Sequence, residues 1–266
     1  EAIALERFVQ KTIIRAPGAP EQRMIVMGDI HGSAHALLRN LLVLYEHGHI
    51  RDDFTLADNV HLMFLGDWTD RGLRGIETIY TILRLKNANC DRVHMVRGNH
   101  ECKSQTTKYG FGQELVSKYP GSSLYDRIQR LYATLPAAIF FGFHDNKRDA
   151  MMFGLGCHGS VSPYFNASAL LADDTKQCAL LEGLDDTITV NRNELPVAHL
   201  FEWSDVTGRA EWEVLAGKND FDPADLSRWL MNDRGIEMHY RDLTKVLASK
   251  GVLFEVRGHQ DDHAAV

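Results

Sequence analysis

Residues that could bind metal ions or phosphate are grouped in five short motifs of this chain. The stretch "GDWTDRG" at 66–72 holds Asp67, Asp70 and Arg71. Four more motifs contain similar side chains: Asp29 and His31 in "GDIHG", Asn99 and His100 in "GNHE", His158 in "CHGS", and His259 in "RGHQ". A glycine stands beside the polar residues of every motif, which allows a sharp turn and lets the backbone approach a ligand. Each motif alone is more often a turn or a buried histidine, but five together favour one shared site.

The chemistry of this residue set is that of a metal site. Three carboxylates, an amide and several imidazoles in one crevice need a cation among them, because neighbouring carboxylates repel each other. Their mixed oxygen and nitrogen donors suit manganese, iron or zinc better than calcium or a thiolate-bound metal. Arg71 suits a phosphate group, because its planar guanidinium donates two parallel hydrogen bonds.

The elements that must position these motifs alternate between strands and helices. Three apolar runs, "RMIVMGD" (23–29), "VHLMFLGD" (60–67) and "RVHMVRGNH" (92–100), are typical of buried strands. Helical spacing predicts helices over 33–48 and 75–89 between them. This β-α-β-α-β order predicts parallel strands with right-handed crossovers. Ligands bind outside the carboxyl ends of such strands, so the motifs should meet in one crevice.

The two helices are expected to bury one face each. The predicted faces are Leu37, Leu38, Leu41, Leu42 and Tyr45 in the first helix, and Ile76, Ile79, Tyr80 and Leu83 in the second. Further along, the sequence predicts a helix over 123–136, a hairpin from strands 137–143 and 150–159, and a last strand at 252–259.

Composition limits the class of protein. The 266 residues are 44% hydrophobic and 24% charged, which indicates one globular domain over 1–266. The net charge of -7 argues against a nucleic-acid partner. Four cysteines without CxxC spacing predict reduced thiols and an intracellular protein. No transmembrane segment is predicted, since the longest apolar stretch, 131–143, contains a proline and falls short of about 20 residues.

The motifs as a set resemble the phosphoprotein phosphatase family, the calcineurin-like serine/threonine metallophosphatases. "GDIHG", "GDWTDRG", "RGNHEC" and "YGF" match its first half, and "CHGSVSP", "WSD", "NDRG" and "RGHQ" match its second half in the same order. The resemblance covers roughly residues 23–262. It implies an α/β (α+β) calcineurin-like metallophosphoesterase fold: a central β-sandwich flanked by helices, with the β-α-β-α-β segment as its metal-binding core.

The resemblance also implies an activity, a cofactor and ligands. The chain would hydrolyse phosphomonoesters on serine or threonine, and on tyrosine, of a phosphoprotein substrate, by attack of a water or hydroxide that bridges two divalent ions. Manganese is the expected ion in vitro, with iron and zinc as alternatives. The implied ligands are Asp29 and His31 for the first ion, Asp67 for both, and Asn99, His158 and His259 for the second.

Four residues carry the remaining roles that the resemblance implies. Arg71 and Arg234 would hold the phosphate, and His100 would act as the general acid, oriented by Asp70. This agrees with elementary chemistry, because a leaving alkoxide or phenoxide needs a proton and an imidazole is a suitable donor.

Several features depart from the family pattern. Trp68-Thr69 stands where the family commonly has Tyr-Val, and Ser160 replaces a usual glycine. Insertions around 163–202 and 206–233 are longer than typical, and would form either a cap over the cleft or peripheral decoration. "GDWTDRG" and these insertions also resemble the bacterial Wip-type effector phosphatases, which are secreted into host cells and are associated with phosphotyrosine as well.

Two rival functions remain. A diadenosine tetraphosphate hydrolase or small bacterial metallophosphatase, acting on dinucleoside polyphosphates or small phosphoesters, shares "GDxHG" and "GNHE". The small bacterial enzymes, however, usually carry their last histidine in "GHT" rather than "RGHQ". A non-catalytic binding module would lack a ligand or the acid, and here every one of these residues is present.

Overall fold

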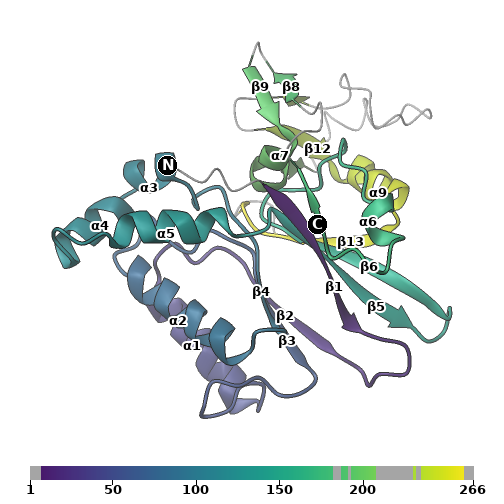
Figure 1. Cartoon of the computed structure of the whole chain (residues 1–266), viewed down its shortest axis with the longest axis horizontal. Helices are drawn as coiled ribbons and strands as arrows, with labels where there is room; N and C mark the ends of the chain where they lie inside the picture. The colour runs from purple at the N-terminus through teal and green to yellow at the C-terminus, as the bar shows by residue number, and fades with distance from the viewer. Residues whose placement is uncertain (1–6, 182–186, 191–192, 208–229, 232–234, 261–266) are drawn as a thin grey trace. The chain divides into compact units, whose positions relative to one another are not determined.

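The structure is a computed structural model that describes residues 7–181, 187–190, 193–207, 230–231 and 235–260. The chain divides into two compact units (Figure 1). One is continuous, Gly18–Leu135, and we call it the 18–135 unit. The other joins Glu1–Pro17 to Pro136–Val266, and we call it the split unit. The prediction of a single domain over 1–266 stays a prediction.

A parallel sheet forms the centre of the 18–135 unit. Its strands are β2 (Arg23–Met27), β3 (Val60–Phe64) and β4 (Val93–Met95), in the order β2-β3-β4. Helices α1 (Ala34–Glu46) and α2 (Gly75–Ala88) connect them and lie side by side (Figure 1). All five residues of β3 are buried, as a central strand of a parallel sheet requires. The predicted β-α-β-α-β order is confirmed.

The buried face of α1 is narrower than predicted. Leu37 and Leu41 are buried, but Leu38, Leu42 and Tyr45 are exposed. Successive residues of a helix point about 100° apart, so each leucine that follows a buried one turns away from the sheet. The prediction of one five-residue face was therefore wrong for three of its members.

The face of α2 also differs from the prediction. Ile79 is buried with Ile82 and Leu85, whereas Tyr80 is 61% exposed. The buried positions follow an i, i+3, i+6 spacing, and Tyr80 lies outside that stripe.

Three further helices complete the 18–135 unit: α3 (Lys103–Lys108), α4 (Phe111–Lys118) and α5 (Leu124–Ala133). The helix predicted over 123–136 is thus confirmed. Helix α5 buries Ile128 and Tyr132 in the same core as Trp68 and Phe111. Trp68 belongs to the loop after β3, so its burial in this core anchors that loop.

The split unit is built on a five-stranded sheet in the order β13-β6-β5-β1-β7. Its strands are β1 (Phe8–Arg15), β5 (Ala138–Asp145), β6 (Ala150–Cys157), β7 (Cys178–Leu180) and β13 (Val252–Arg257). The predicted hairpin is confirmed as β5–β6, and the predicted last strand as β13, which runs parallel to β6. The sequence analysis did not predict β1.

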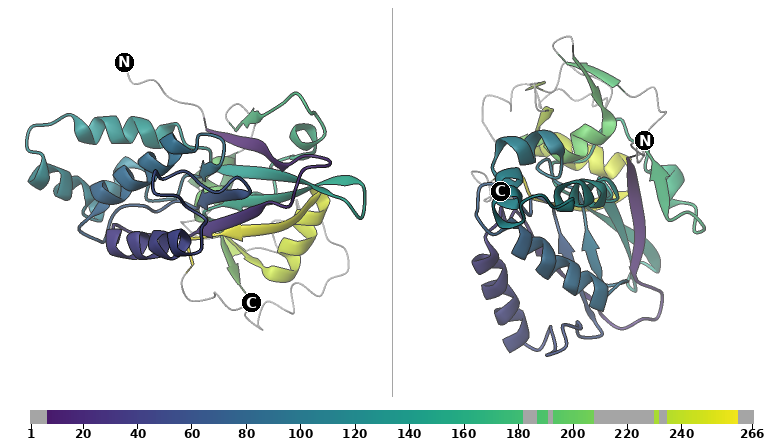
Figure 2. Two further views of the ribbon diagram at one scale, coloured as in Figure 1. Left: turned by 90° about the horizontal axis from the view of Figure 1, so that it is seen from below. Right: turned by 60° about the vertical axis from the view of Figure 1, so that its left-hand side comes forward.

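Shorter elements surround this sheet. They are α6 (Ser168–Leu171), β8 (Thr187–Val190), β9 (Asn193–Pro196), α7 (Val197–Trp203), β10 (Asp205–Thr207), β11 (Leu230–Met231), β12 (Ile236–His239) and α9 (Tyr240–Ser249). Strands β10, β12 and β11 form a small sheet, and β8 pairs with β9. Figure 2 shows α9, in yellow, beside β13.

The first predicted insertion adds a strand to the large sheet. Within 163–202, β7 pairs with β1 and forms the sheet edge. Most of the second insertion, 206–233, lies outside the described residues. All four cysteines are free, and Cys90 and Cys178 are exposed. Within the part of the chain that the structure describes, no helix has the length and apolar character needed to cross a membrane.

Candidate active site

The loops after the three parallel strands are joined by backbone hydrogen bonds. The amides of Ile30 and His31 both donate to Asp67 O, at 3.0 and 2.9 Å. Gly66 has φ +96°, and a Cβ at this position would lie 2.4 Å from Gly98 N. Only glycine fits so close to another backbone. The motifs after β2, β3 and β4 therefore meet at the carboxyl edge of the sheet, as predicted.

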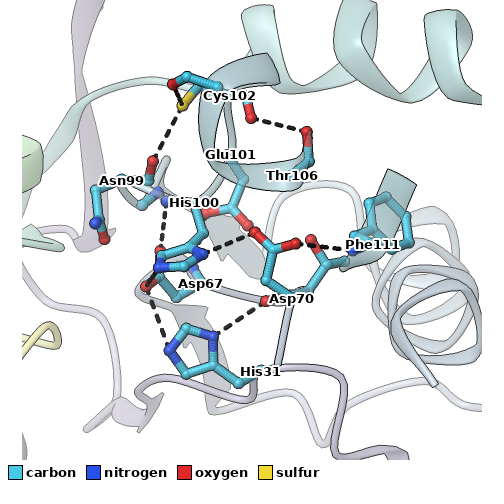
Figure 3. Close-up of polar contacts among 12 residues, drawn as sticks. His31, Asp67, Asp70, Asn99, His100, Glu101, Cys102, Thr106 and Phe111 are labelled. Carbon is cyan, nitrogen blue, oxygen red and sulfur yellow. Dashed lines mark hydrogen bonds and ion pairs between the residues drawn. The ribbon is translucent and has the colours of Figure 1, made fainter. Parts of the chain in front are cut away.

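Asp67 lies between two imidazole rings (Figure 3). Its Oδ2 is 3.6 Å from His31 Nε2 and 4.0 Å from His100 Nε2. One donor atom from each of these three residues lies within 4.8 Å of the others. Asp29 Oδ2 is 3.9 Å from the same His31 nitrogen. This group of carboxylate oxygens and imidazole nitrogens is a donor set that divalent transition metals accept.

The orientation of His31 fits the role of a metal ligand. Its Nδ1 lies 3.1 Å from Thr69 O, and a carbonyl can only accept, so Nδ1 carries the proton. In the neutral ring, Nε2 then has a free lone pair directed at the carboxylates of Asp29 and Asp67. Metal-bound histidines commonly donate their second nitrogen to a carbonyl or a carboxylate in this way.

His100 and Asp70 form a buried pair. His100 Nδ1 is 2.7 Å from Asp70 Oδ2, and the two residues are 2% and 0% exposed. The other oxygen of Asp70 accepts from Phe111 N at 3.0 Å. The pair fixes the imidazole so that Nε2 points toward the Asp67 side of the loop cluster (Figure 3). Such an arrangement can hold a proton on a defined nitrogen.

Strained backbone conformations gather at the predicted site residues. Seven non-glycine residues of the described chain have positive φ, and five of them are predicted site residues: His31, Asp67, Asp70, Arg71 and His259. Residues other than glycine, asparagine and aspartate rarely adopt this region, so the strain is clearest at His31, Arg71 and His259. Such conformations persist where the surrounding structure enforces them, and they cluster at functional sites.

Glu101 is a positioning residue that the sequence analysis left without a role. Its carboxylate accepts hydrogen bonds from the amides of Asp67 at 2.7 Å, Trp68 at 3.0 Å and Gly98 at 2.8 Å. Glu101 is 0% exposed, so these amides have a fully buried acceptor. The sequence signal for this role was the glutamate that follows Asn99 and His100 in "GNHE". A glutamate next to buried site residues is expected to be buried too, and a buried carboxylate needs several hydrogen-bond donors.

Residues of the "YGF" stretch hold the loop that carries Asp70 and Arg71. Arg71 N donates to Tyr109 O at 2.9 Å, and the Tyr109 ring lies 4.9 Å from the His100 ring. Of the other two predicted site residues in this unit, Arg71 is exposed and Asn99 is buried. Trp68, which stands where the family commonly has tyrosine, is fully buried in the core of this unit.

The split unit brings two further predicted ligands together. Strands β6 and β13 are parallel neighbours, and His158 and His259 follow their ends. His259 Nδ1 is 3.2 Å from His158 Nε2, so one of these nitrogens donates to the other. Asp205, in the "WSD" motif, lies 3.7 Å from His259 Nε2 and was missed as a site residue. Arg234 lies outside the described residues.

A parallel sheet with carboxylates, imidazoles and a buried His–Asp pair at its carboxyl edge defines a candidate metal-dependent hydrolase. The sequence matches the family model of calcineurin-like phosphoesterases over residues 22–261. The chain therefore belongs to the calcineurin-like phosphoesterase family, and the predicted α/β fold class is confirmed. The family implies divalent metal ions, and the cluster of Asp67 with His31 and His100 is a potential metal-binding group.

Similar proteins with curated names are serine/threonine phosphatases. A serine/threonine-protein phosphatase PP2A-like PPG1 of Candida albicans (strain SC5314) is 37% identical over 139 residues, which cover 52% of this chain and 29% of the relative. Serine/threonine-protein phosphatase 7 of Arabidopsis thaliana is 38% identical over 117 residues, which cover 43% of this chain and 26% of the relative. The chain thus spans less than a third of the length of either relative.

A solved structure shares the fold. It is a protein serine/threonine phosphatase from Saccharomyces cerevisiae with similarity to human phosphatase PP5. The TM-score is 0.59 at 20% identity, and the alignment covers 95% of this chain and 65% of that chain.

Proposed function

We propose that this chain is a metal-dependent phosphoprotein phosphatase that hydrolyses phosphomonoesters on serine or threonine side chains, and on tyrosine. The observation that carries the proposal is the buried His100–Asp70 pair beside the cluster of His31 and Asp67, at 2.7 and 3.6 Å. The names of the two curated relatives support the serine and threonine part of this proposal, whereas the tyrosine part rests on the sequence resemblance alone.

The proposed metal ligands are the six predicted from the sequence: Asp29, His31, Asp67, Asn99, His158 and His259. We propose two divalent ions, with manganese as the ion active in vitro. When bound, such ions would act as Lewis acids, lowering the pKa of a bound water to about 7 and neutralising phosphoryl charge. The carboxylate and imidazole donors present in each unit fit ions of this type.

The remaining proposed residues bind the phosphate and move a proton. Arg71, exposed beside Asp70, would donate to the phosphoryl oxygens, together with Arg234. His100 would donate its Nε2 proton to the leaving serine, threonine or tyrosine oxygen. Asp70 accepts from Nδ1 at 2.7 Å and would keep the ring in the orientation and protonation state that this transfer needs.

Kinetics on a panel of substrates test this function. We expect turnover of phosphoserine, phosphothreonine and phosphotyrosine peptides that depends on added Mn²⁺, with diadenosine tetraphosphate as a poor substrate. Asp58→Asn is a suitable control, because it removes an exposed carboxylate of the 18–135 unit. Preferential hydrolysis of the dinucleotide would favour the alternative function instead. The resemblance to secreted bacterial effectors and the intracellular location stay predictions.

A further inference from the structure

The segment after His158 is held by a buried carboxylate that the predicted site does not include. Glu255 lies in β13, and its side chain is 2% exposed. Its Oε1 accepts from Ser160 Oγ at 3.0 Å, and its Oε2 accepts from Val161 N at 2.7 Å. Ser160 and Val161 are fully buried. Glu255 is therefore the acceptor for a backbone amide and a hydroxyl that have no access to water.

Arg257 holds the same segment from the next position on this face of β13. Residues two apart on a strand point to one face, and Arg257 Nε lies 3.8 Å from Glu255 Oε1. Arg257 Nε donates to Gly159 O, and Nη2 donates to Ser204 O at 2.8 Å. Arg257 thus donates to Gly159, and Glu255 accepts from the next two residues, Ser160 and Val161.

Backbone hydrogen bonds also hold His158 and the residue after it. Gly258 N donates to His158 O at 3.1 Å, and Gly159 N donates to Phe201 O at 2.7 Å. With the backbone held on both sides, His158 Nε2 comes to 3.2 Å from His259 Nδ1. A shift of Ser160 or Val161 would therefore be transmitted to this pair of rings.

The same contacts account for a departure noted in the sequence. Ser160 replaces a glycine that is usual in the phosphoprotein phosphatase family, and a glycine has no hydroxyl to donate to Glu255. A buried carboxylate is costly unless it is hydrogen-bonded. Ser160 and Glu255 therefore act as a matched pair in this chain.

We propose that Glu255, acting through Ser160 and the Val161 amide, is a positioning residue that orients His158 for metal binding. The inference rests on the proposed function, because it takes His158 to be a metal ligand. Groups that orient metal ligands typically change metal affinity by about 10- to 100-fold when they are removed. A residue that only stabilised the fold would change the unfolding temperature without this loss.

Titration of the metal-free chain with Mn²⁺, followed by calorimetry, tests the proposal. Glu255→Leu should weaken one of two Mn²⁺ sites by about 10- to 100-fold. Glu255→Gln keeps a carbonyl acceptor for Val161 N and should recover most of the affinity. The matched control is Asp242→Leu, which removes a carboxylate of α9 in the same unit that is 1% exposed. It should lower stability and leave both sites unchanged.

Ser160→Gly supplies a second variant that does not depend on the folding of Glu255→Leu. It removes the hydroxyl alone and should weaken the same site to a smaller extent. Added to Glu255→Leu, it should have almost no further effect, because the two residues act as a pair. The ring ¹⁵N shifts of His158 and His259 in the metal-free protein should move in both single variants.

The possible failures are distinguishable. If the wild-type chain bound no Mn²⁺, the proposed function would fail. If the wild-type chain bound two ions, and Glu255→Leu and Ser160→Gly matched it in affinity and ring shifts, the positioning role would be overturned. Weakening by Asp242→Leu equal to that by Glu255→Leu would also overturn it, because the effect would then follow stability alone.

Discussion

At the scale of single residues, His100 and Asp70 combine burial with a defined proton position. Asp70 accepts from both His100 Nδ1 and Phe111 N, so its two oxygens are both occupied. Its positive φ, shared with Asp67 and Arg71, shows that the loop is bent to hold these side chains. The sequence pattern predicted that Asp70 would lie against His100, and the structure shows this contact. The second bond of Asp70, to Phe111 N, could be seen only in the structure.

Replacement of His100 by asparagine should separate proton transfer from metal binding. We expect kcat on a phosphoserine peptide to fall by roughly 10²- to 10⁴-fold, the usual contribution of general acid catalysis, with the number of bound metal ions unchanged. The loss should be smaller on an aryl phosphate whose leaving group needs no proton. Steady-state kinetics on both substrates, with metal analysis, provide the measurement.

The matched control for this variant is His94→Asn. His94 is also a buried histidine of the 18–135 unit, bonded to His61 at 3.1 Å rather than to an aspartate. It should cost stability and leave the ratio of the two activities unchanged. Equal losses of His100→Asn on the serine phosphate and the aryl phosphate would contradict the assignment of His100 as the acid.

At the scale of elements, two lysines attach the first insertion to the split unit. Lys250, at the end of α9, donates to Pro163 O at 2.8 Å and Phe165 O at 2.6 Å. Lys11 of β1 donates to the carbonyls of Leu170 and Asp173, at the end of α6. Together with β7, these contacts fix the described start of the insertion to the large sheet of its own unit. The sequence could not reveal this attachment, because lysines are rarely buried.

The ammonium of Lys250 makes stability depend on pH. Burial lowers the pKa of Lys250 from 10.5 to about 8. Between these values the unfolded chain binds more protons than the folded chain, so stability rises as the pH increases from 8 to 10.5. The full gain is at most about 3 kcal/mol, from the 10.5 to 8 difference. Below pH 8 the folded protein carries the whole cost of the buried charge.

Urea unfolding at about pH 7.5 and about pH 9.5 measures this effect. We expect the free energy of unfolding to rise by about 1–2 kcal/mol between these pH values through Lys250 alone. Lys250→Met should remove that increment. Lys176→Met replaces an exposed lysine of the same unit and serves as the control. If Lys250→Met kept the pH dependence of the wild-type protein, the burial cost would have to lie elsewhere.

At the scale of the whole molecule, periodicity and motif order predicted most of the architecture. Apolar runs that end in Gly-Asp or Gly-Asn indicated β2, β3 and β4, because buried parallel strands have a strong signal. The faces of α1 and α2 were predicted less well, since spacing alone does not show how wide a buried stripe is. The contacts of Glu101 and Glu255 were missed because their partners are backbone amides, which every sequence position except proline offers, or, for Glu255, a serine hydroxyl nearly a hundred residues away in the sequence.

Divalent metal should stabilise the folded chain, because ions that bind the folded state and not the unfolded state shift the equilibrium toward folding. With Mn²⁺ at about 100 times its dissociation constant, the gain is about 2.7 kcal/mol. For a chain of this size that corresponds to roughly 5–10 °C in Tm. Calorimetry with Mn²⁺, and again after removal of the metal by a chelator, measures the shift.

Asp67→Asn decides whether this stabilisation comes from the proposed site. The asparagine carbonyl can still accept from His100 N, which donates to Asp67 Oδ1 at 2.9 Å in the wild-type protein. The variant also loses a negative charge near Asp29, so its metal-free Tm should be no lower than that of the wild type. Its Mn²⁺-dependent shift, however, should largely disappear along with phosphatase activity. An undiminished shift would place the stabilising ions away from Asp67, and Asp58→Asn should keep the full shift in either case.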